Sequence, residues 1–328
     1  MGNDTDGRLR ESPGARAGRV VRIDRGWSTV LLDDASTVRV RNIGADVAVG
    51  DRVMLDADAE RIASVEERTS AIARRNSFEG ARAMRQVVAA NIDTVFVVHA
   101  VTVEPNPRRL ERELVLAFDS GADPVVVLTK IDLVDPGYVD EVRERLAGTA
   151  VGVAILAVSS ATGEGLDRLR DLLPPGSTVA LIGASGAGKS TLVNALVGRE
   201  VQRTAEVRDD DQRGRHTTVA AELIELPWGA WLLDTPGLRA VTLWTSGRGI
   251  EMAFPEVFAA ADGCRFRDCK HADEPGCAVN AAIAEGTIRP ERLESMRRLV
   301  AEEFSVEEET IERERSMDRR GVRRPRRN

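Results

Sequence analysis

The sequence predicts an α/β domain with a parallel sheet, preceded by a small β-barrel and followed by a small helical domain. Three observations support this. About five short strand-like segments, separated by Gly, Asp and Asn, fill residues 16–75. Apolar runs alternate with helical patterns from about residue 87 onward, and the last part combines a Cys/His cluster with further helical patterns. Short, closely spaced strands favour an OB-like barrel, and alternating strands and helices favour a parallel sheet with right-handed crossovers.

The α/β part can be divided into elements by its apolar runs. Residues 93–101 form a continuous apolar run, as expected for a strand covered on both faces. A helical stretch with Leu110, Leu114 and Phe118 at helical spacing follows it. We expect strands at 93–101, 124–130, 153–159, 177–183, 222–227 and 230–237, and helices at 107–120, 138–147, 165–173 and from 192.

Composition excludes several function classes. The 328 residues are 42% hydrophobic and 30% charged, without the run of about 18 apolar residues that a membrane helix needs. The polar beginning of the chain lacks the apolar region of a secretion signal, so we expect a cytoplasmic protein without membrane contact. A net charge of −7 argues against nucleic-acid binding by the whole surface, but residues 313–328 carry eight Arg and two acids. Such a tail can contact a phosphate backbone or remain solvated.

A phosphate-binding loop, GASGAGKST, joins the strand at 177–183 to a helix. Its glycines let backbone N–H groups turn toward phosphates, which is the context that the P-loop pattern requires. We expect Lys189 to bridge the β- and γ-phosphates and Ser190 to ligate Mg²⁺. The loop residues are Gly183, Ala184, Ser185, Gly186, Ala187, Gly188, Lys189, Ser190 and Thr191.

A second motif, TKID, identifies the base. Guanine presents an N1–H and a 2-amino group, and the carboxylate of Asp132 can accept from both. The stem of Lys130 can lie over the base, and Ile131 completes the turn. Thr129 stands where Asn is usual, and its hydroxyl can donate to a neighbouring backbone group.

The loop SSATG follows the next expected strand and resembles the loop that binds guanine O6 through a backbone N–H. A plain turn between strand and helix is the alternative. The residues concerned are Ser159, Ser160 and Ala161.

The motif DTPG predicts the magnesium side of the site. We expect Asp234 to hold Mg²⁺ through water and the N–H of Gly237 to sense the γ-phosphate. The polar segment 206–219 contains RGRHTT, and either Thr217 or Thr218 is expected to complete the Mg²⁺ shell when GTP is bound.

Slow hydrolysis is expected because Leu238 occupies the position where a Ras-like GTPase has a water-orienting Gln. His216 is the candidate to position the attacking water. A surface histidine without a catalytic role is the alternative.

The order of these motifs is unusual. In an ordinary GTPase the phosphate loop comes first and the base-reading motif comes last, but here TKID precedes GASGAGKST. The sequence therefore predicts an α/β P-loop GTPase domain that is circularly permuted.

The Cys/His cluster reads C-x₄-C-x-H-x₅-C and uses every cysteine of the chain. Three thiolates and one imidazole fill a tetrahedral zinc shell and leave no open position, so we expect one structural zinc ion. Three free thiols without a metal are the alternative. The expected ligands are Cys264, Cys269, His271 and Cys277.

The order TKID, SSATG, GASGAGKST, RGRHTT and DTPG, between an OB-like domain and a Cys/His cluster, resembles the RsgA family of bacterial GTPases that depend on the small ribosomal subunit. The resemblance spans about residues 18–303 and includes QVVAANIDTV, FPEV and EPGCAV. Thr129 and Met296 depart from it, since the family usually has Asn at the first and often Tyr at the second. The resemblance implies a factor in late maturation of the small subunit. The resemblance also implies that hydrolysis of GTP to GDP and phosphate is stimulated by the subunit and coupled to release.

Two other functions remain open at this point. The cluster could carry labile zinc in a GTP-regulated metallochaperone, although a closed shell argues against easy release. The chain could also be a non-enzymatic RNA-binding scaffold, although complete nucleotide motifs argue against that. We expect a monomer that binds the small subunit, its rRNA and GTP or GDP. Its expected parts are a disordered lead (1–15), an OB-fold (16–75), the GTPase domain (76–240), a helical zinc-binding domain (241–303) and a basic tail (304–328).

Overall fold

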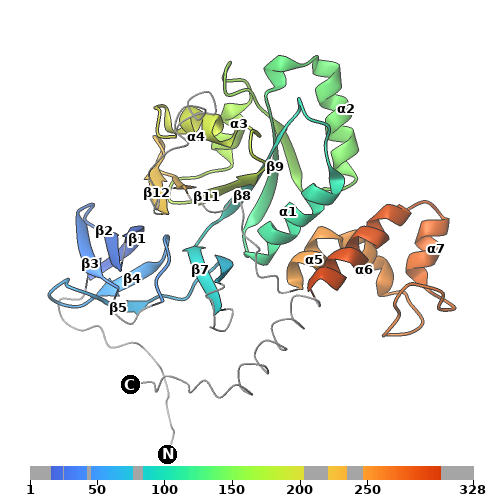
Figure 1. Ribbon diagram of the computed structural model, residues 1–328, viewed down its shortest axis with the longest axis horizontal. Helices are drawn as coiled ribbons and strands as arrows, with labels where there is room; N and C mark the ends of the chain where they lie inside the picture. The colour runs from blue at the N-terminus through green and yellow to red at the C-terminus, as the bar shows by residue number, and fades with distance from the viewer. Residues whose placement is uncertain are drawn as a thin grey trace, which may run out of the picture.

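A computed structural model describes residues 16–24, 26–42, 46–76, 84–202, 221–234 and 247–303. The described chain forms a small barrel, a central sheet flanked by helices, and a group of C-terminal helices (Figure 1). The expected lead and tail lie outside the described residues, as do His216, Thr217, Thr218 and Gly237.

The N-terminal strands close into a barrel. Strand β1 pairs antiparallel with both β2 and β4, β2 pairs with β3, and β4 pairs with β5. A parallel bridge between Arg41 and Arg61 joins the end of β3 to the start of β5. The resulting cyclic order β1-β2-β3-β5-β4 is that of a five-stranded OB-like barrel, as predicted. The strands are β1 (Arg16–Asp24), β2 (Trp27–Leu32), β3 (Thr37–Arg41), β4 (Arg52–Leu55) and β5 (Ile62–Val65).

Strict alternation along β2 explains how the barrel closes. Ser28, Val30 and Leu32 are buried, whereas the residues between them are partly exposed. Because successive side chains of a strand point to opposite faces, one face fills the barrel and the other meets solvent. The barrel core consists of Val20, Val30, Leu32, Val40, Val53, Leu55 and Ile62.

The central sheet has the order β10-β9-β8-β11-β13-β12. Every neighbouring pair is parallel except β12 and β13. The predicted apolar strands are confirmed, and β8 is buried at all positions but His99. The strands are β8 (Thr94–Ala100), β9 (Asp123–Thr129), β10 (Ala154–Ala157), β11 (Thr178–Gly183), β12 (Glu222–Glu225) and β13 (Trp231–Asp234).

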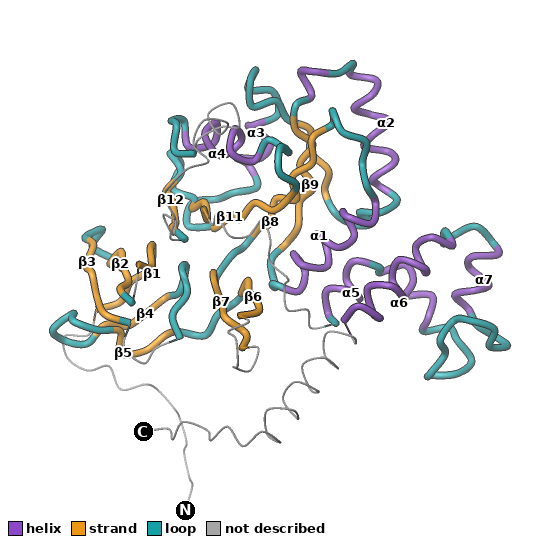
Figure 2. The backbone as a smooth tube through the Cα atoms, in the orientation of Figure 1, coloured by secondary structure: helices purple, strands orange, loops and turns teal. Residues whose placement is uncertain are grey.

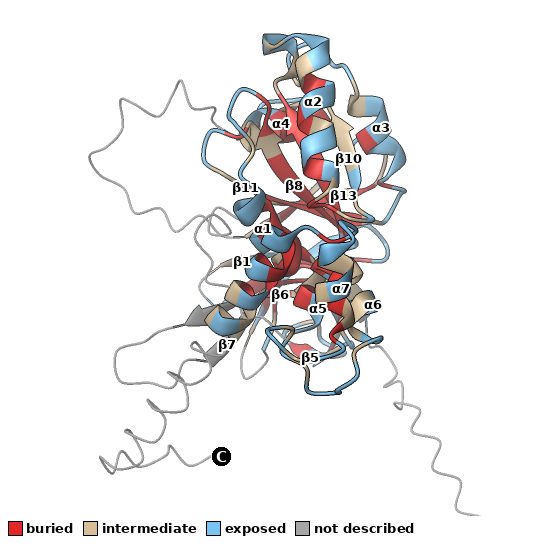
Figure 3. Cartoon of the chain, turned by 90° about the vertical axis from the view of Figure 1, so that its right-hand side faces the viewer, coloured by how far each residue is buried: buried red, intermediate tan, exposed pale blue. Residues whose placement is uncertain are grey.

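Helices cover this sheet on both faces, and the strands between them are largely buried (Figure 3). Val95 and Val97 of β8 pack in one core with α1 and α2, whereas Phe96 and Val98 pack in a second core with α3 and α4. The continuous apolar runs follow from burial on both faces. The helices are α1 (Pro107–Asp119), α2 (Pro136–Ala147), α3 (Leu166–Asp171) and α4 (Lys189–Val197).

The barrel is joined to the central sheet at one edge. Arg22 of β1 pairs with Glu222 of β12, so the barrel strands continue the sheet. Arg19 reaches across this junction, donates to the hydroxyl of Thr178, and lies 5.9 Å from the ring centre of Trp231. Burial lowers the pKa of Arg19 to about 10, which still leaves the guanidinium charged at neutral pH.

A hairpin formed by β6 (Ala71–Asn76) and β7 (Met84–Ala90) lies beside the barrel and below the central sheet in the view of Figure 2. The sequence suggests a domain boundary after residue 75, and this position lies within strand β6. Gly50 shows how tightly the hairpin fits, because a Cβ there would lie 2.1 Å from the carbonyl oxygen of Ala90.

The C-terminal part of the chain is helical, as predicted, and its helices pack against α1. The elements are α5 (Arg248–Ala253), α6 (Pro255–Ala261), α7 (Ala278–Ala284) and the helical residues 290–303. Gly249 of α5 donates its N–H to Asp119 at 2.7 Å, and a Cβ at Gly249 would lie 2.3 Å from the carbonyl oxygen of Val115. Glycine thus permits the close approach of α5 to α1. Among the described helices, none has the length and apolar character to cross a membrane.

Candidate functional site

The phosphate loop lies where β11 ends and α4 begins, at the carboxyl edge of the parallel sheet. Gly183, Gly186 and Gly188 have φ angles of 140°, 76° and 89°, a region that side chains disfavour. A Cβ on Gly183 would lie 2.3 Å from the carbonyl oxygen of Val98. The glycines of the motif therefore make a turn that other residues would strain, and the N-terminus of α4 points into it.

Lys189 is the first residue of α4, and its side chain folds back over the loop. Its Nζ donates to the carbonyl oxygen of Gly183 at 2.9 Å and to that of Ala184. Ser190 is half-buried behind it, and Ser185 and Gly186 form the exposed tip. The ammonium group is thus held inside the curve of the loop, beside the helix N-terminus that favours an anion.

The TKID turn lies directly against the phosphate loop. The buried hydroxyl of Thr129 donates to the carbonyl oxygen of Ala187 at 2.6 Å. Nζ of Lys130 donates to the carbonyl oxygen of Gly186 at 2.9 Å. The fold therefore brings together two motifs that are far apart in the sequence.

Asp132 is exposed, but a buried side chain beneath it holds its carboxylate in place. The hydroxyl of Ser159, which is fully buried, donates to Oδ1 of Asp132 at 2.6 Å. The same hydroxyl oxygen accepts the N–H groups of Ala161 at 3.2 Å and Thr162 at 3.1 Å. The SSATG loop and the TKID turn therefore form one unit, because β10 and β9 are neighbours in the sheet.

The role of Ser159 as a support for Asp132 was not predicted from the sequence. One feature of the sequence could have indicated this role. Ser159 lies at the end of one predicted strand, and the TKID turn lies at the end of another predicted strand. Ser160 is half-buried and Ala161 is exposed. Ile131 starts a short 3₁₀ turn (η1, Ile131–Leu133) and packs against the main core.

Asp234 ends β13, the strand beside β11, so it lies at the same edge of the sheet as the phosphate loop. Its Oδ1 accepts a hydrogen bond from Nε2 of Gln202 at 2.7 Å. The backbone of Gln202 is in turn bound by the side chain of Asn194 in α4. Neither Gln202 nor Asn194 was predicted from the sequence as part of the site. Asn194, a polar residue in the otherwise apolar stretch LVNALV, was the available signal.

A cavity of about 770 Å³ opens beside Asp234, between the barrel and the end of the central sheet. Its wall includes Leu31 from the barrel, Glu222 from β12, Trp231 from β13 and Arg199 from the segment after α4. Asp234 therefore borders space that solvent and hydrated ions can enter.

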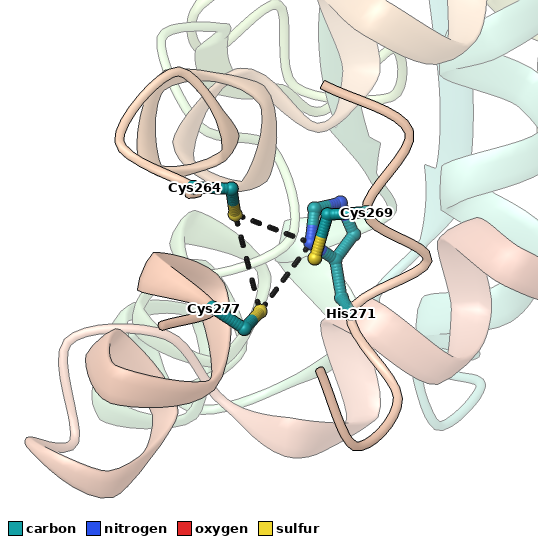
Figure 4. Close-up of side chains that lie close together, drawn as sticks. All are labelled: Cys264, Cys269, His271 and Cys277. Atoms are coloured by element: carbon teal, nitrogen blue, oxygen red, sulfur yellow. Dashed lines mark hydrogen bonds between the residues drawn. The ribbon is translucent and has the colours of Figure 1, made fainter. Parts of the chain in front are cut away.

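A separate cluster of Cys264, Cys269, His271 and Cys277 lies among the C-terminal helices (Figure 4). All four ligand atoms lie within 4.8 Å of one another. The two thiols Cys264 and Cys277 are 3.9 Å apart, and they lie 3.6 Å and 3.5 Å from Nδ1 of His271. A zinc tetrahedron with bonds of about 2.3 Å to sulfur and about 2.0 Å to nitrogen has edges of about 3.8 Å and 3.5 Å. The residues therefore fit a tetrahedral metal ion.

Local backbone geometry brings the four ligands together. Cys277 caps the N-terminus of α7, and its sulfur accepts the N–H of Asn280 at 3.4 Å. His271 has a φ of 59°, in the left-handed region, which turns the chain back toward Cys264. The cluster thus depends on the end of α6, the loop after it and the start of α7.

Ionisation in the cluster also suits a cation. Burial opposes ionisation of Cys264, but the N–H groups of Val279 and Ala278 outweigh it and lower the pKa of this thiol. Burial and the neighbouring thiols raise the pKa of Cys269 to about 11. Burial, aided by Arg297, lowers the pKa of His271 and keeps its imidazole neutral, the form that binds metal. The positive charge of a bound divalent cation stabilises thiolate ligands.

Known proteins share this combination of parts. Residues 65–244, more than half of the chain, match the family model described as RsgA GTPase. The chain belongs to the RsgA GTPase family. A relative from Streptomyces avermitilis, named small ribosomal subunit biogenesis GTPase RsgA, is 43% identical over 94% of this chain and 85% of its own length.

Two solved structures show the same fold. The crystal structure of YjeQ from Thermotoga maritima has a TM-score of 0.65 and 26% identity, and covers 88% of this chain and 99% of its own. YloQ, described as a circularly permuted GTPase, has a TM-score of 0.64 and 21% identity over 91% of this chain and 98% of its own. The predicted fold class is confirmed, and this RsgA-family chain is a GTP-hydrolysing enzyme.

Proposed function

We propose that this GTPase binds the small ribosomal subunit and assists its late maturation, and that the subunit stimulates hydrolysis, which leads to release. The name of the Streptomyces avermitilis relative supports this proposal, because the similarity covers 94% of the chain rather than the GTPase domain alone. A relative from Methanosarcina acetivorans has the same name and is 43% identical over 80% of this chain.

The geometry that carries the choice of nucleotide is the contact between the TKID turn and the phosphate loop. Thr129 and Lys130 bind the loop backbone, and Ser159 orients Asp132 toward the base position. A carboxylate in this position accepts both donors of guanine, whereas adenine offers neither at those atoms. We therefore assign guanine recognition to residues 129–132 and 159–161, and phosphate binding to residues 183–191.

We further assign the chemistry of hydrolysis to Lys189, Ser190 and Asp234, with Gly237 sensing the γ-phosphate. Mg²⁺ bound with GTP would neutralise charge on the β- and γ-phosphates, held by Ser190 and by Thr217 or Thr218. Lys189, beside the N-terminus of α4, stabilises charge on the phosphates in the transition state. His216 is proposed to orient the attacking water.

The Cys₃His cluster is proposed to hold one structural zinc ion rather than zinc for delivery. Its four ligand atoms fill a tetrahedron, and a full shell leaves no position through which an acceptor can take the metal. The donor set of three thiols and one imidazole is also characteristic of structural zinc. Zinc would link the loop after α6 to the start of α7.

Contact with rRNA is proposed for the barrel, the zinc-binding helices and the basic tail. The barrel offers the clearest site, because Arg39 and Arg41 lie 5.2 Å and 5.0 Å from the ring centre of Trp27. Within the described residues, neither arginine forms an ion pair with a carboxylate, so both charges can meet phosphate groups. Binding through such charges releases counterions and weakens steeply with salt.

We propose that the chain is divided into a lead at 1–15, the barrel at 16–75, the GTPase domain at 76–240, the zinc-binding domain at 241–303 and the tail at 304–328. A GTPase that works on ribosomal subunits acts in the cytoplasm. We propose that it does so as a monomer without membrane contact, because each of its sites is built from one chain.

The test compares GTP hydrolysis by the purified protein alone, with small subunits, and with large subunits. Small subunits should raise the turnover rate well above the rate of the protein alone, and large subunits should not. Equal rates in all three samples, with GTP binding intact, contradict the proposed partner. Binding of ATP as tight as that of GTP contradicts the proposed base recognition.

A further inference from the structure

The carboxylate of Asp234 is engaged by a residue that no motif contains. Nε2 of Gln202 donates to Oδ1 of Asp234 at 2.7 Å, and both side chains are half-buried. Gln202 follows α4 and precedes the stretch of sequence that contains RGRHTT. A hydrogen bond to a charged acceptor is among the stronger ones in proteins, so this contact affects which partners Asp234 takes.

Asn194 holds Gln202 in place for this contact. Its Oδ1 accepts the N–H groups of Val201 and Gln202, each at 2.9 Å. Its Nδ2 donates to the carbonyl oxygen of Gln202 at 2.8 Å. Three hydrogen bonds thus fix residues 201–202 to α4. Their anchor, Asn194, lies one helical turn after Ser190. The carboxamide of Gln202 reaches Asp234 from a backbone that is already fixed, so forming the contact costs little additional ordering.

The chemistry of Asp234 makes this contact reversible. A water bound to Mg²⁺ donates a hydrogen bond, as the amide does, but the charge of the ion makes the water a stronger donor. Asp234 also lines an open cavity, so a hydrated ion can approach it. A water bound to Mg²⁺ can therefore replace the neutral amide as a hydrogen-bond donor to this carboxylate oxygen.

We propose that Gln202 is a positioning residue that occupies Asp234 in the magnesium-free protein and releases it when Mg²⁺ and GTP bind. The proposal rests on the proposed role of Asp234 beside Mg²⁺. The contact gives the enzyme one measurable property: Gln202 sets how much Mg²⁺ is needed for tight nucleotide binding.

A purely structural role for Gln202 makes a different prediction. If the contact only stabilises the fold, its loss lowers the melting temperature and weakens nucleotide binding equally with and without magnesium. If Gln202 competes with magnesium, its loss changes the magnesium dependence alone. The two roles are therefore separated by measuring nucleotide affinity across a range of free Mg²⁺.

The main variant is Gln202→Met, which keeps the length of the side chain and removes its donor. Affinity for a fluorescent GTP analogue is measured from EDTA to millimolar Mg²⁺. The Mg²⁺ concentration at the midpoint should fall roughly three- to tenfold, since the lost contact is a half-exposed hydrogen bond to a charged group. Affinity in EDTA should change less than about twofold. Ser64→Ala, a neutral change at an exposed barrel residue that does not line this cavity, is the control and should leave both values unchanged.

Two more variants complete the test. Asn194→Ala frees residues 201–202 but keeps the amide, so its midpoint should move in the same direction by a smaller factor. An unchanged midpoint in both Gln202→Met and Asn194→Ala, with both proteins folded by circular dichroism, overturns the proposal. Asp234→Asn tests the site itself. If that variant keeps the wild-type magnesium dependence, the proposed role of Asp234 fails, which is a distinct result from failure of Gln202 alone.

Discussion

Glu111 of α1 and Arg292 of the C-terminal helices form a buried ion pair, with 2.9 Å between Oε1 and Nη1 and 4% of each side chain exposed. Arg292 also binds Glu256 at 2.6 Å and the carbonyl oxygen of Ala253 at 2.8 Å, and it lies 4.2 Å from the ring centre of Phe254. One guanidinium group thus joins the zinc-binding helices to the GTPase domain. The attachment is to α1, on the layer of the sheet opposite to α3 and α4.

Replacing Arg292 by Met should destabilise the protein strongly. Removing one partner of a buried pair leaves an uncompensated charge, here on Glu111 and Glu256, and costs about 3–5 kcal/mol. The free energy of unfolding, measured in urea by circular dichroism, should fall by that amount, with the C-terminal helices lost first.

Arg108→Met is the matched control, because Arg108 spans the same interface to Glu294 at 3.9 Å with 68% of its side chain exposed. Exposed pairs contribute less than about 1 kcal/mol. Equal losses in the two variants contradict the view that the buried network anchors the zinc-binding helices.

Removal of zinc should unfold the segment around α6 and α7 and spare the central sheet. The metal joins Cys264 to Cys277, and the structure gives the intervening loop few buried apolar residues of its own. Elemental analysis should find one zinc ion per chain, and Cys277→Ala should lose it together with part of the helical signal in circular dichroism.

Asp268→Asn lies in the same loop without a ligand role and should keep a full equivalent of zinc. Two results contradict a structural ion. One is full zinc occupancy in Cys277→Ala. The other is rapid transfer of zinc to a weak chelator while the helices stay folded, which is the behaviour of a metal carrier.

Most of the fold follows from local sequence patterns. DTVFVVHAV predicts a strand buried on both faces, because only a central strand of a layered α/β domain removes every side chain from water. The glycines of GASGAGKST predict the phosphate loop, because three of them adopt φ angles that disfavour side chains. The Cys and His spacing predicts the cluster, because its members are close in the sequence and reach one another through a single loop.

Contacts between distant segments could not be predicted. The pairing of the barrel strand β1 with strand β12 of the sheet has one register pair, Arg22 with Glu222. The pattern of apolar and polar residues in these two strands does not indicate that they pair. The partners of Arg292 are 36 and 181 residues away, so nothing local distinguishes this arginine from its exposed neighbours. The support of Asp132 by Ser159 likewise arises from the order of strands in the sheet.

Ser159→Ala should weaken binding of guanine nucleotides and leave other nucleotides unaffected. The variant removes the donor that orients Asp132 and leaves the N–H groups of Ala161 and Thr162 without their acceptor. We expect about tenfold weaker GTP and GDP binding, the equivalent of about 1.4 kcal/mol for a hydrogen bond to a charged group. Titration calorimetry with GTP and ATP measures the ratio of the two affinities.

Ser160→Ala is the matched control, because it keeps the backbone N–H groups assigned to guanine recognition and, among the described residues, the Ser160 side chain has no hydrogen bond. It should retain wild-type affinity for GTP. A loss of ATP binding as large as the loss of GTP binding in Ser159→Ala would mean that Ser159 supports the whole nucleotide site rather than the base reader.

Neutralising Arg39 and Arg41 should weaken binding to the small ribosomal subunit. Both charges flank the partly exposed ring of Trp27, an arrangement in which arginines can bind phosphates while an aromatic ring supports a base. In Arg39→Gln/Arg41→Gln, the slope of log affinity against log salt should become shallower by about 1.4–1.8, or 0.7–0.9 for each lost phosphate contact. Arg143→Gln/Arg145→Gln on α2 removes the same charge from a surface far from the barrel and serves as the control (Figure 1). GTP hydrolysis without subunits should be unchanged in both double variants. If the α2 variant weakens subunit binding as much as the barrel variant, the interaction depends on net charge and not on this face of the barrel.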